Sequence, residues 1–279
     1  MAATAHRLSG GRYALGLGRG FGALFEVMGL PKVTGGQLRD VVELYRRLWR
    51  GEAVLDHRGP AGTYPYLQQD SSFDENIPVM LAAIGDRTLE LAGEIADGVV
   101  LHSFFADDTL ARAVRVIRSA AEGAGRDPTS VRVWSVLVTV PEPMPQERVL
   151  RRLTGRLATY LQGYGDVLVR ANGWDPEALR AFRGDPVVAG FPGAFDAVAT
   201  AEQLAHLHEL LPAEWLDAAA VGGPRRCAER IGDQFSAGAD GVVLHAAEPA
   251  ELPGVLDAWR EVRAPAAFSS LPVNPGRSA

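Results

Sequence analysis

The sequence has little of what disulfide-linked, cysteine-ligated or nucleic-acid-binding proteins contain. Cys227 is its single cysteine among 279 residues, which excludes an internal disulfide and a cysteine metal cage. Lys32 is its single lysine, and the arginines form no continuous basic stripe. Because the formal net charge is −6, we expect no nucleic-acid partner.

Long apolar segments are also missing. The first ten residues, MAATAHRLSG, lack the apolar core of a signal peptide. No stretch reaches the roughly 18–20 apolar residues that a membrane helix needs. We therefore expect a cytoplasmic protein without a membrane partner. The apolar content of 47% is typical of a globular protein folded as one large or two small domains.

What the sequence does contain is an alternation of apolar runs and amphipathic segments. The predicted strands are Gly11–Gly18, Ile77–Ala83, Gly98–Ser103, Val131–Val140 and Gly241–Ala246. The predicted helices are Gln37–Arg50, Arg87–Ala96, Asp107–Gly123, Arg225–Ser236 and Glu251–Arg263, with a broken helical region before Pro212. A long loop is predicted over Gly51–Asn76. Strands that alternate with helices indicate an α/β fold with a parallel sheet.

Two of the predicted strands carry the same seven residues, ADGVVLH, beginning at Ala96 and at Ala239. Each copy follows a helix and enters its strand through Asp-Gly. In a β/α barrel every unit solves the same packing problem, so we interpret the repeat as scaffolding. Asp97 and Asp240 are predicted to be turn residues. His102 and His245 end their copies at the carboxyl side of the strands, where barrel active sites lie.

Glycines follow the first predicted strand. Gly18 begins a G-x-G-x-x-A match to the dinucleotide-binding fingerprint, but the acidic residue at the right distance, Asp40, lies inside a predicted helix. A Rossmann site is therefore disfavoured, and the glycines more simply allow a flat ring or a phosphate to approach the backbone. Arg19 either supplies charge to an anion or faces solvent.

A second strand-to-helix junction, from Ala82 to Gly85, offers small residues before a helix. This is the pattern of an anion site, and equally of a tight turn. Walker, G-x-S-x-G and H-E-x-x-H motifs are absent. His206 and His208 fall on a predicted helix and are interpreted as surface residues, and Cys227 as a small packing residue.

Three segments together resemble a known family. They are LSGGRYALGLGRG at Leu8–Gly20, IPVMLAAIGDRTLELAGEIADGVVLH at Ile77–His102 and AGADGVVLH at Ala237–His245. They are similar to the luciferase-like monooxygenase superfamily, in particular to its branch that uses the deazaflavin coenzyme F420. The resemblance extends through nearly the whole chain to Arg263. The Pro/Ser-rich tail, residues 264–279, is predicted to be disordered.

The resemblance implies a TIM-type (β/α)8 barrel domain over residues 1–263, here with about five strands that correspond to the family's fourth to eighth. Three βα units, or about 90 residues at about 30 residues each, would then precede Leu8. Five strands leave two open sheet edges. We therefore expect the 279-residue chain alone to be poorly soluble or inactive.

The resemblance also implies where a cofactor would lie. Gly18, Arg19 and Gly20 would lie near its ring system, Ala82, Ala83, Ile84 and Gly85 beside its phosphate or side chain, His102 and Ser103 at the cofactor–substrate interface, and His245 at the rim. Some relatives carry a glutamate where this chain has Phe21, and sugar-phosphate-oxidising members a lysine where it has Phe104-Phe105. The substrate is accordingly expected to be a less polar small molecule.

The leading expectation is an oxidoreductase that transfers a hydride between coenzyme F420 and a small organic substrate, with His102 first and His245 second as proton-transfer residues. An FMN-dependent monooxygenase is the alternative on the same fold. A metal-dependent hydrolase needs strand-end ligands such as H-x-H, and we expect no metal. A truncated, non-catalytic relic is the remaining class. The segments Gly51–Asn76, with Tyr64, Tyr66 and Phe73, and Tyr160–Trp215 are expected to cover the pocket, and a homodimer is implied by the resemblance alone.

Overall fold

The computed structural model describes residues 1–20, 22–264 and 266, and within them the chain forms two compact units. Of the described residues, unit 1 contains 1–20, 22–100 and 115–133, and unit 2 contains 101–114, 134–264 and 266. The predicted tail, residues 264–279, lies outside the described residues except for 264 and 266. Phe21 also lies outside them.

Unit 1 is built on parallel strands. Strand β1 (Leu15–Leu17) pairs with β4 (Val79–Ala83), and β5 (Gly98–Leu101) lies on the other side of β4. Asp97, at the start of β5, accepts a hydrogen bond from the Val79 backbone N–H at 2.8 Å and forms an ion pair with Arg46 at 3.0 Å. Asp97, which was predicted to be a turn residue, therefore links the start of β5 to the start of β4.

Unit 1 contains the predicted helices and two more. Helix α3 (Gly35–Trp49) was predicted, whereas α1 (Ala2–Leu8), before β1, and α2 (Gly22–Val27), after it, were not. Helix α4 (Asp86–Ile95) leads into β5. A Cβ at Gly93 of α4 would lie 2.3 Å from the Ile117 carbonyl oxygen, so only glycine allows α4 to approach α5 (Asp107–Gly123) this closely.

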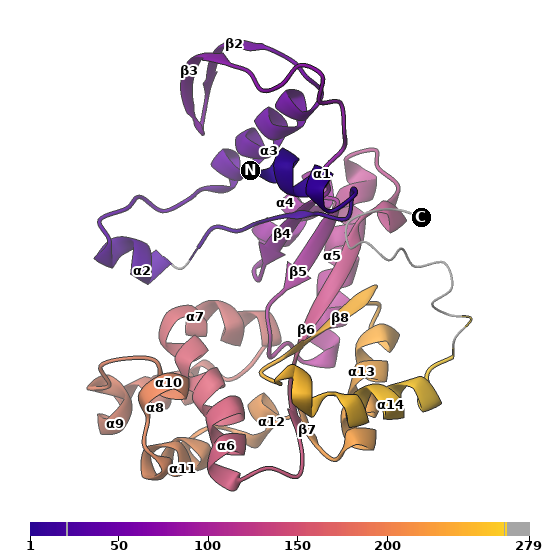
Figure 1. Ribbon diagram of the computed structural model, residues 1–279. Helices are drawn as coiled ribbons and strands as arrows, with labels where there is room; N and C mark the ends of the chain where they lie inside the picture. Colours follow the sequence, from indigo (N-terminus) through magenta and orange to yellow (C-terminus); the bar gives the residue numbers. More distant parts are fainter. Residues whose placement is uncertain (21, 265, 267–279) are drawn as a thin grey trace. The chain divides into compact units, whose positions relative to one another are not determined.

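The predicted loop Gly51–Asn76 is wrong over much of its length, because it contains an antiparallel hairpin. Strands β2 (Val54–Gly59) and β3 (Gly62–Leu67) lie beside α3, as Figure 1 shows at the top of the view. Buried Asp40 of α3 accepts hydrogen bonds from the Ala61 backbone N–H at 2.8 Å and from His57 at 3.1 Å. Asp40 is thus structural, as its helical position predicted.

Unit 2 is organised around one long strand, β6 (Arg132–Pro141), which runs into it from unit 1. Strand β8 (Gly241–His245) pairs in parallel with its first half, from Trp134↔Gly241 to Val138↔His245. A three-residue strand, β7 (Ala220–Gly222), was not predicted and pairs in parallel with the end of β6.

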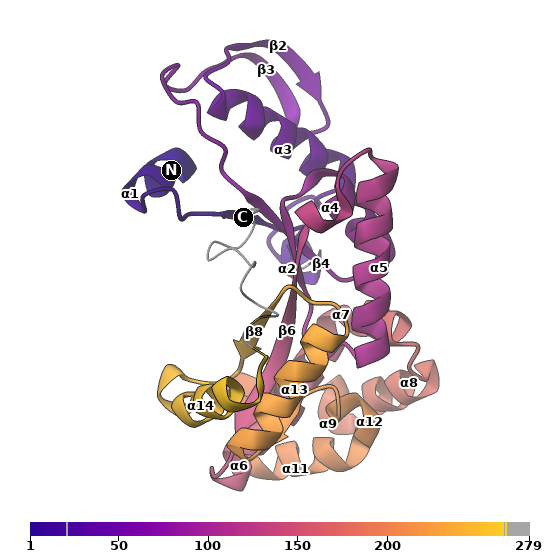
Figure 2. The same ribbon diagram turned by 90° about the vertical axis from the view of Figure 1, so that its right-hand side faces the viewer.

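Helices α13 (Pro224–Ser236) and α14 (Pro253–Val262) lie side by side and cover these strands (Figure 2). Their shared core is Leu137, Ala220, Cys227, Ile231 and Val255. The Cys227 thiol is fully buried and lies 3.5 Å from the Gly222 carbonyl oxygen. The prediction that it is a small packing residue is confirmed.

The region between β6 and β7 is helical and broken, as predicted, with breaks at Asn172-Gly173, Gly184-Asp185-Pro186 and Gly190–Gly193. It comprises α6 (Gln146–Leu150), a π-helical turn (Arg151–Gly155), α7 (Arg156–Asn172), α8 (Pro176–Gly184), α9 (Pro186–Ala189), α10 (Phe195–Val198), α11 (Ala201–Leu210) and α12 (Ala213–Leu216). In the described part of the chain, no helix combines the length and apolarity needed to cross a membrane.

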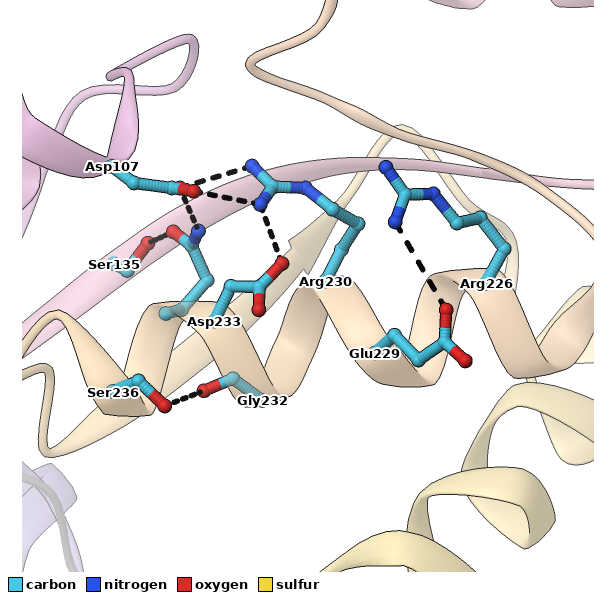
Figure 3. A network of polar contacts seen from close by, with 9 residues as sticks. Asp107, Ser135, Arg226, Glu229, Arg230, Gly232, Asp233 and Ser236 are labelled. Carbon is cyan, nitrogen blue, oxygen red and sulfur yellow. Dashed lines mark hydrogen bonds and ion pairs between the residues drawn. The ribbon is translucent and has the colours of Figure 1, made fainter.

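A polar network fixes the start of α5 within unit 2 (Figure 3). The Arg230 guanidinium of α13 donates to both carboxylate oxygens of Asp107, at 2.9 and 3.0 Å. Gln234 donates to the same carboxylate and accepts from Ser135 of β6 at 2.5 Å. Asp107 is the first residue of α5, and its carboxylate binds Arg230.

Candidate functional site

The residues predicted from the sequence form two groups, one in each unit. In unit 1, Gly18–Gly20 follow β1 and Ala82–Gly85 follow or end β4. Because Leu17 pairs with Leu81, the two strand ends lie next to each other. A Cβ placed on Gly18 would lie 3.4 Å from the Ala82 Cβ, which is ordinary contact. The structure therefore brings these two predicted segments together.

Gly16, Gly18 and Ala82 are exposed and make a strip without bulky side chains, which we call the small-residue strip. A Cβ on Gly16 would meet no atom within 4 Å. Gly20 has a φ of +71°, and a Cβ there would lie 2.4 Å from the Phe25 ring, so this position requires glycine. The strip is thus backbone that a flat group can approach.

Arg19 and the β4–α4 junction are less specific. The Arg19 side chain is exposed and its Nε donates to the Val33 carbonyl oxygen at 2.8 Å. Ala83 is buried and Ile84 half-buried. Gly85 occupies the N-cap of α4, where no side chain caps the first turn. An uncapped helix start of this kind attracts anions.

The second group lies in unit 2, where a tyrosine of α7 lies between the two strand-end histidines. The Tyr160 hydroxyl lies 3.1 Å from His245 Nε2. The His102 ring packs edge-on against Tyr160, with ring centroids 4.6 Å apart, and against Tyr164, with centroids 5.4 Å apart. The two tyrosines are four residues apart and share one helix face. We call these four side chains the His–Tyr cluster.

The protonation of His102 follows from its neighbours. Its Nδ1 lies 2.9 Å from the Ser103 carbonyl oxygen, which can only accept, so Nδ1 carries a proton. Burial, with a smaller effect of the nearby His245, lowers the pKa of His102 below its ordinary value. Near pH 7 the ring is therefore neutral, and its Nε2 carries a lone pair. His102 can accept a proton there but has none to give.

Charged residues flank the cluster. The Arg156 guanidinium lies 5.9 Å from the centre of the Tyr160 ring and forms a 2.8 Å ion pair with Asp196 of α10. Burial, and then the positive charge of Arg156, lower the pKa of His245. Burial raises the pKa of Tyr164. All four side chains of the His–Tyr cluster are partly exposed, so solvent reaches the group.

The loop that carries His102 and Ser103 is held in an uncommon conformation. Phe104 has a φ of +61°, a left-handed value that bulky side chains rarely adopt. The Asn172 amide at the end of α7 donates to the Phe104 carbonyl oxygen at 3.0 Å, and its oxygen accepts from the Ala106 backbone N–H at 2.9 Å. One side chain thus fixes both sides of this loop.

Phe104 and Phe105, which stand where some relatives carry a lysine, are both buried. One predicted role is wrong. Phe73 is also buried, beneath the Arg7 guanidinium at 4.8 Å, and does not cover a pocket. Tyr160, by contrast, belongs to the segment predicted as a cover. Its contact with both histidines was not foreseen, and its only signal was a tyrosine pair at helical spacing.

The helical H-x-H pair does not converge on a common point. His206 of α11 pairs with Asp185 at 2.8 Å, whereas His208 is hydrogen-bonded to Thr154 at 2.9 Å. Both are exposed, as predicted. Within the described residues, no group of three or more His, Cys, Asp or Glu side chains has a metal-binding arrangement.

An open groove of about 690 Å³ lies elsewhere in unit 1, among α3, α4 and α5. Its lining includes Arg39, Glu90, Glu94 and Arg115. It contains none of the predicted site residues, and its charged walls do not suit a flat aromatic ring. We therefore assign no part of the candidate site to it.

Comparison with known proteins supplies the context for both groups. A family model described as luciferase-like monooxygenase matches residues 1–241. A 5,10-methylenetetrahydromethanopterin reductase from Methanolobus tindarius is 26% identical over 245 residues, which are 85% of this chain and 69% of that protein.

Solved structures are similar as well. The coenzyme F420-dependent tetrahydromethanopterin reductase of Methanopyrus kandleri matches with a TM-score of 0.72 at 22% identity, over 96% of this chain and 78% of that one. An F420-dependent secondary alcohol dehydrogenase, solved with an F420–acetone adduct, matches with a TM-score of 0.63 at 19% identity, over 94% and 72%. At these identities the likeness shows the fold, which is the α/β barrel fold of those enzymes with part of its strands.

Proposed function

Because the chain belongs to the luciferase-like monooxygenase family, we propose that it is an oxidoreductase that transfers a hydride between coenzyme F420 and a small organic substrate. The choice of F420 is supported by the reductase from Methanolobus tindarius and by the two F420-dependent enzymes with a similar fold. The observation that carries the proposal in this chain is the small-residue strip, because a flat ring system needs such a surface.

The residues present fit a deazaflavin. Its ring would lie against Gly18 and the rest of the small-residue strip, where no bulky side chain intervenes, with Gly20 beside it under the Phe25 ring. Its acidic side chain would run toward Ala82–Gly85, where the uncapped start of α4 favours negative charge. Arg19 is exposed next to the strip and adds a positive charge there. When bound, the deazaflavin supplies the hydride-carrying carbon.

The chain's own residues would orient the substrate and move the proton that accompanies the hydride. His102 and Ser103 follow β5 at its carboxyl end, the side on which barrel enzymes place their substrates. Neutral His102 would accept a proton or a hydrogen bond at Nε2. His245, at the end of β8, would be the second proton-transfer residue, and its partly exposed ring allows exchange with solvent.

An FMN-dependent monooxygenase is the second candidate, and the family's description as monooxygenases favours it. The small-residue strip would accept the ring of FMN equally well. The two candidates differ in the electron carrier and in the need for oxygen, and direct binding distinguishes them.

Against the expectation that open sheet edges leave the chain inactive, we expect purified protein to bind oxidised F420 more tightly than FMN in an absorbance or fluorescence titration. Gly18→Ala would add a methyl group to the strip while making only ordinary contact with Ala82, so the fold should survive. We expect it to weaken F420 binding about tenfold, which is about 1.4 kcal/mol. Gly184→Ala, at an exposed helix end with open space around it, is the matched control.

Tighter binding of FMN would favour the monooxygenase. An unchanged Kd for F420 in Gly18→Ala would remove the strip from the cofactor site.

A further inference from the structure

Four charged side chains of unit 2 connect the loop after β8 with the helical segment that leads into α7. Arg148 of α6 forms ion pairs with Glu248 at 2.6 Å and with Glu251 at 3.1 Å. Arg152 of the π-helical turn forms an ion pair with Glu248 at 2.9 Å and another with Glu251. Each arginine thus bridges both glutamates, and the four side chains form one network, which we call the loop network.

Arg152 and Glu251 form the more buried half of the loop network. Their side chains are 12% and 19% exposed, whereas those of Arg148 and Glu248 are 42% and 62% exposed. The hydrogen bond from Arg152 lowers the pKa of Glu251 below its ordinary value, so both groups are ionised near pH 7. Ion pairs in a network that is partly shielded from water contribute more than isolated surface pairs do. The network therefore depends most on Arg152.

The loop that the network holds begins in an uncommon conformation. Ala246, directly after His245, has a φ of +70°, a left-handed value that a residue with a Cβ adopts at an energetic cost. The Glu248 backbone N–H donates to the Glu251 carboxylate at 2.8 Å, and the Glu251 N–H donates back to the Glu248 carbonyl oxygen at 2.9 Å. Because so few residues separate His245 from Glu248, the ion pairs fix the backbone turn that ends β8.

The helical segment that carries Arg152 also carries the partner of the His245 ring. Helix α6, the π-helical turn and α7 follow one another without a break. Tyr160 lies on α7, with its hydroxyl 3.1 Å from His245 Nε2. One continuous segment therefore contacts His245 at its ring and, through the loop network, holds the backbone that follows it.

We propose that Arg152 is a positioning residue for His245, which it holds within hydrogen-bond reach of Tyr160 by fixing the loop after β8. The inference rests on the proposed function for the proton-transfer role of this imidazole. Burial and the charge of Arg156 lower the pKa of the ring, and Asp196 opposes them. Without Arg152 the loop relaxes, the ring reaches water, and its pKa rises toward the ordinary value.

Two substitutions separate positioning from a direct effect of charge, because they remove opposite charges. Arg152→Met removes a positive charge, whereas Glu251→Gln removes a negative one and keeps an oxygen that accepts from the Glu248 N–H. If the groups act only as charges, the first variant raises the pKa of His245 and the second lowers it. If they hold the loop, both variants raise it. We expect both to raise it, as measured by ¹⁵N-histidine NMR of the full chain across a pH series.

Hydrogen exchange reports on the loop itself. The backbone amides of Glu248 and Glu251 are hydrogen-bonded within the loop. In both variants they should exchange about fivefold faster, which corresponds to about 1 kcal/mol. Arg183→Met is the matched control, because it removes an arginine that instead pairs with Asp166 of α7 at 2.8 Å. It should change neither the exchange of these amides nor the His245 titration.

A further substitution tests the route through the backbone. Glycine adopts a left-handed φ without the cost that a Cβ imposes. Ala246→Gly, added to Arg152→Met, should therefore return the amide exchange and the His245 titration toward their wild-type values. No recovery in the double variant would contradict this route.

The remaining outcomes are equally distinct. Opposite shifts of the His245 titration in the two single variants would mean that the network acts only through its charges. An unchanged titration in both would leave Arg152 a merely stabilising residue. If Arg152→Met does not fold, Glu251→Gln alone decides, because only loss of positioning raises the pKa of His245 in that variant. None of these measurements uses a cofactor, so failure of the wild-type protein to bind F420 would overturn the proposed function and not the positioning of His245.

Discussion

The two strand-end imidazoles are neutral in the folded protein near pH 7. Burial lowers the pKa of both His102 and His245 below the ordinary value of about 6.5. In the unfolded chain both rings regain that ordinary value. Between the two pKa values the unfolded state binds more protons than the folded state, so acid favours unfolding.

This difference predicts the pH dependence of stability. As pH falls through about 6.5, the free energy of unfolding should decrease, because protons bind preferentially to the unfolded chain. His102→Gln removes one of these groups and should flatten that decrease between pH 7 and 5. Urea unfolding across this range measures the slope. His208→Gln, which replaces an exposed ring bonded to the Thr154 hydroxyl and not to a carboxylate, is the control, and equal slopes for wild type and His102→Gln would contradict the prediction.

At the same scale, the glycines of the two ADGVVLH copies show why a repeated sequence need not mean a repeated function. A Cβ on Gly98 would lie 2.4 Å from the Met80 sulfur, and a Cβ on Gly241 would lie 2.7 Å from the Trp134 ring. Each glycine lets a large side chain of the neighbouring strand cross its own strand. Steric packing therefore explains the glycines of the repeat and supports its interpretation as scaffolding. The sequence could not show this, because Met80 and Trp134 are distant along the chain from the glycines that they contact.

At the scale of whole elements, the ion pair between α13 and α5 should be a measurable part of the stability of unit 2. Arg230 is almost fully buried and donates two hydrogen bonds to the Asp107 carboxylate. Arg230→Met would keep much of the packing volume, leave Asp107 with the Gln234 hydrogen bond alone and remove the ion pair between Arg230 and Asp233. Because the Asp107 side chain is about half exposed, at 47%, we expect a loss of about 1–3 kcal/mol in urea unfolding.

The exposed pair between Arg260 and Asp257 of α14 provides the comparison. Arg260→Met should cost less than about 1 kcal/mol, because exposed pairs contribute little. Equal losses for the two variants would mean that burial does not strengthen the Arg230 pair.

Elements were predictable where their own residues carried the signal. Helix α5 was predicted over its observed range, because it has seventeen residues with one continuous apolar face. The hairpin β2–β3 was missed because its strands pair only with each other and carry Asp56, with a φ of +46°, and Pro65 in their interiors. Strand β7 was missed because three residues are too few for a periodic pattern.

At the scale of the whole molecule, Cys227 should report on unfolding. Its thiol lies in the core shared by β6, β7, α13 and α14, and burial raises its pKa to about 11. The thiolate is the reactive form, so the native protein should react with iodoacetamide or a disulfide reagent far more slowly than the unfolded chain. Labelling across a urea series should follow the same transition as circular dichroism. Rapid labelling in native buffer would contradict the burial.

The candidate site could be predicted from the sequence only in part, for a reason that concerns the whole chain. The Gly18 and Ala82 segments were identifiable because each ends a recognisable strand, and parallel strands bring like ends together. His102 and His245 were identifiable for the same reason. Tyr160 and Asn172 were not, because they come from a broken helical region whose packing on the strand ends depends on contacts more than 60 residues apart.

The conformation of the loop that carries His102 depends on the Asn172 side-chain amide, which is a chemically labile group. Asparagine is among the thermolabile residues, and here it is followed by Gly173, which has a φ of +65° and no side chain to shield the amide. Hydrolysis of that amide would replace the donor facing the Phe104 carbonyl with a second carboxylate oxygen, so attraction would turn to repulsion. Older preparations should therefore contain a growing fraction of protein with one more negative charge beside the His102 loop.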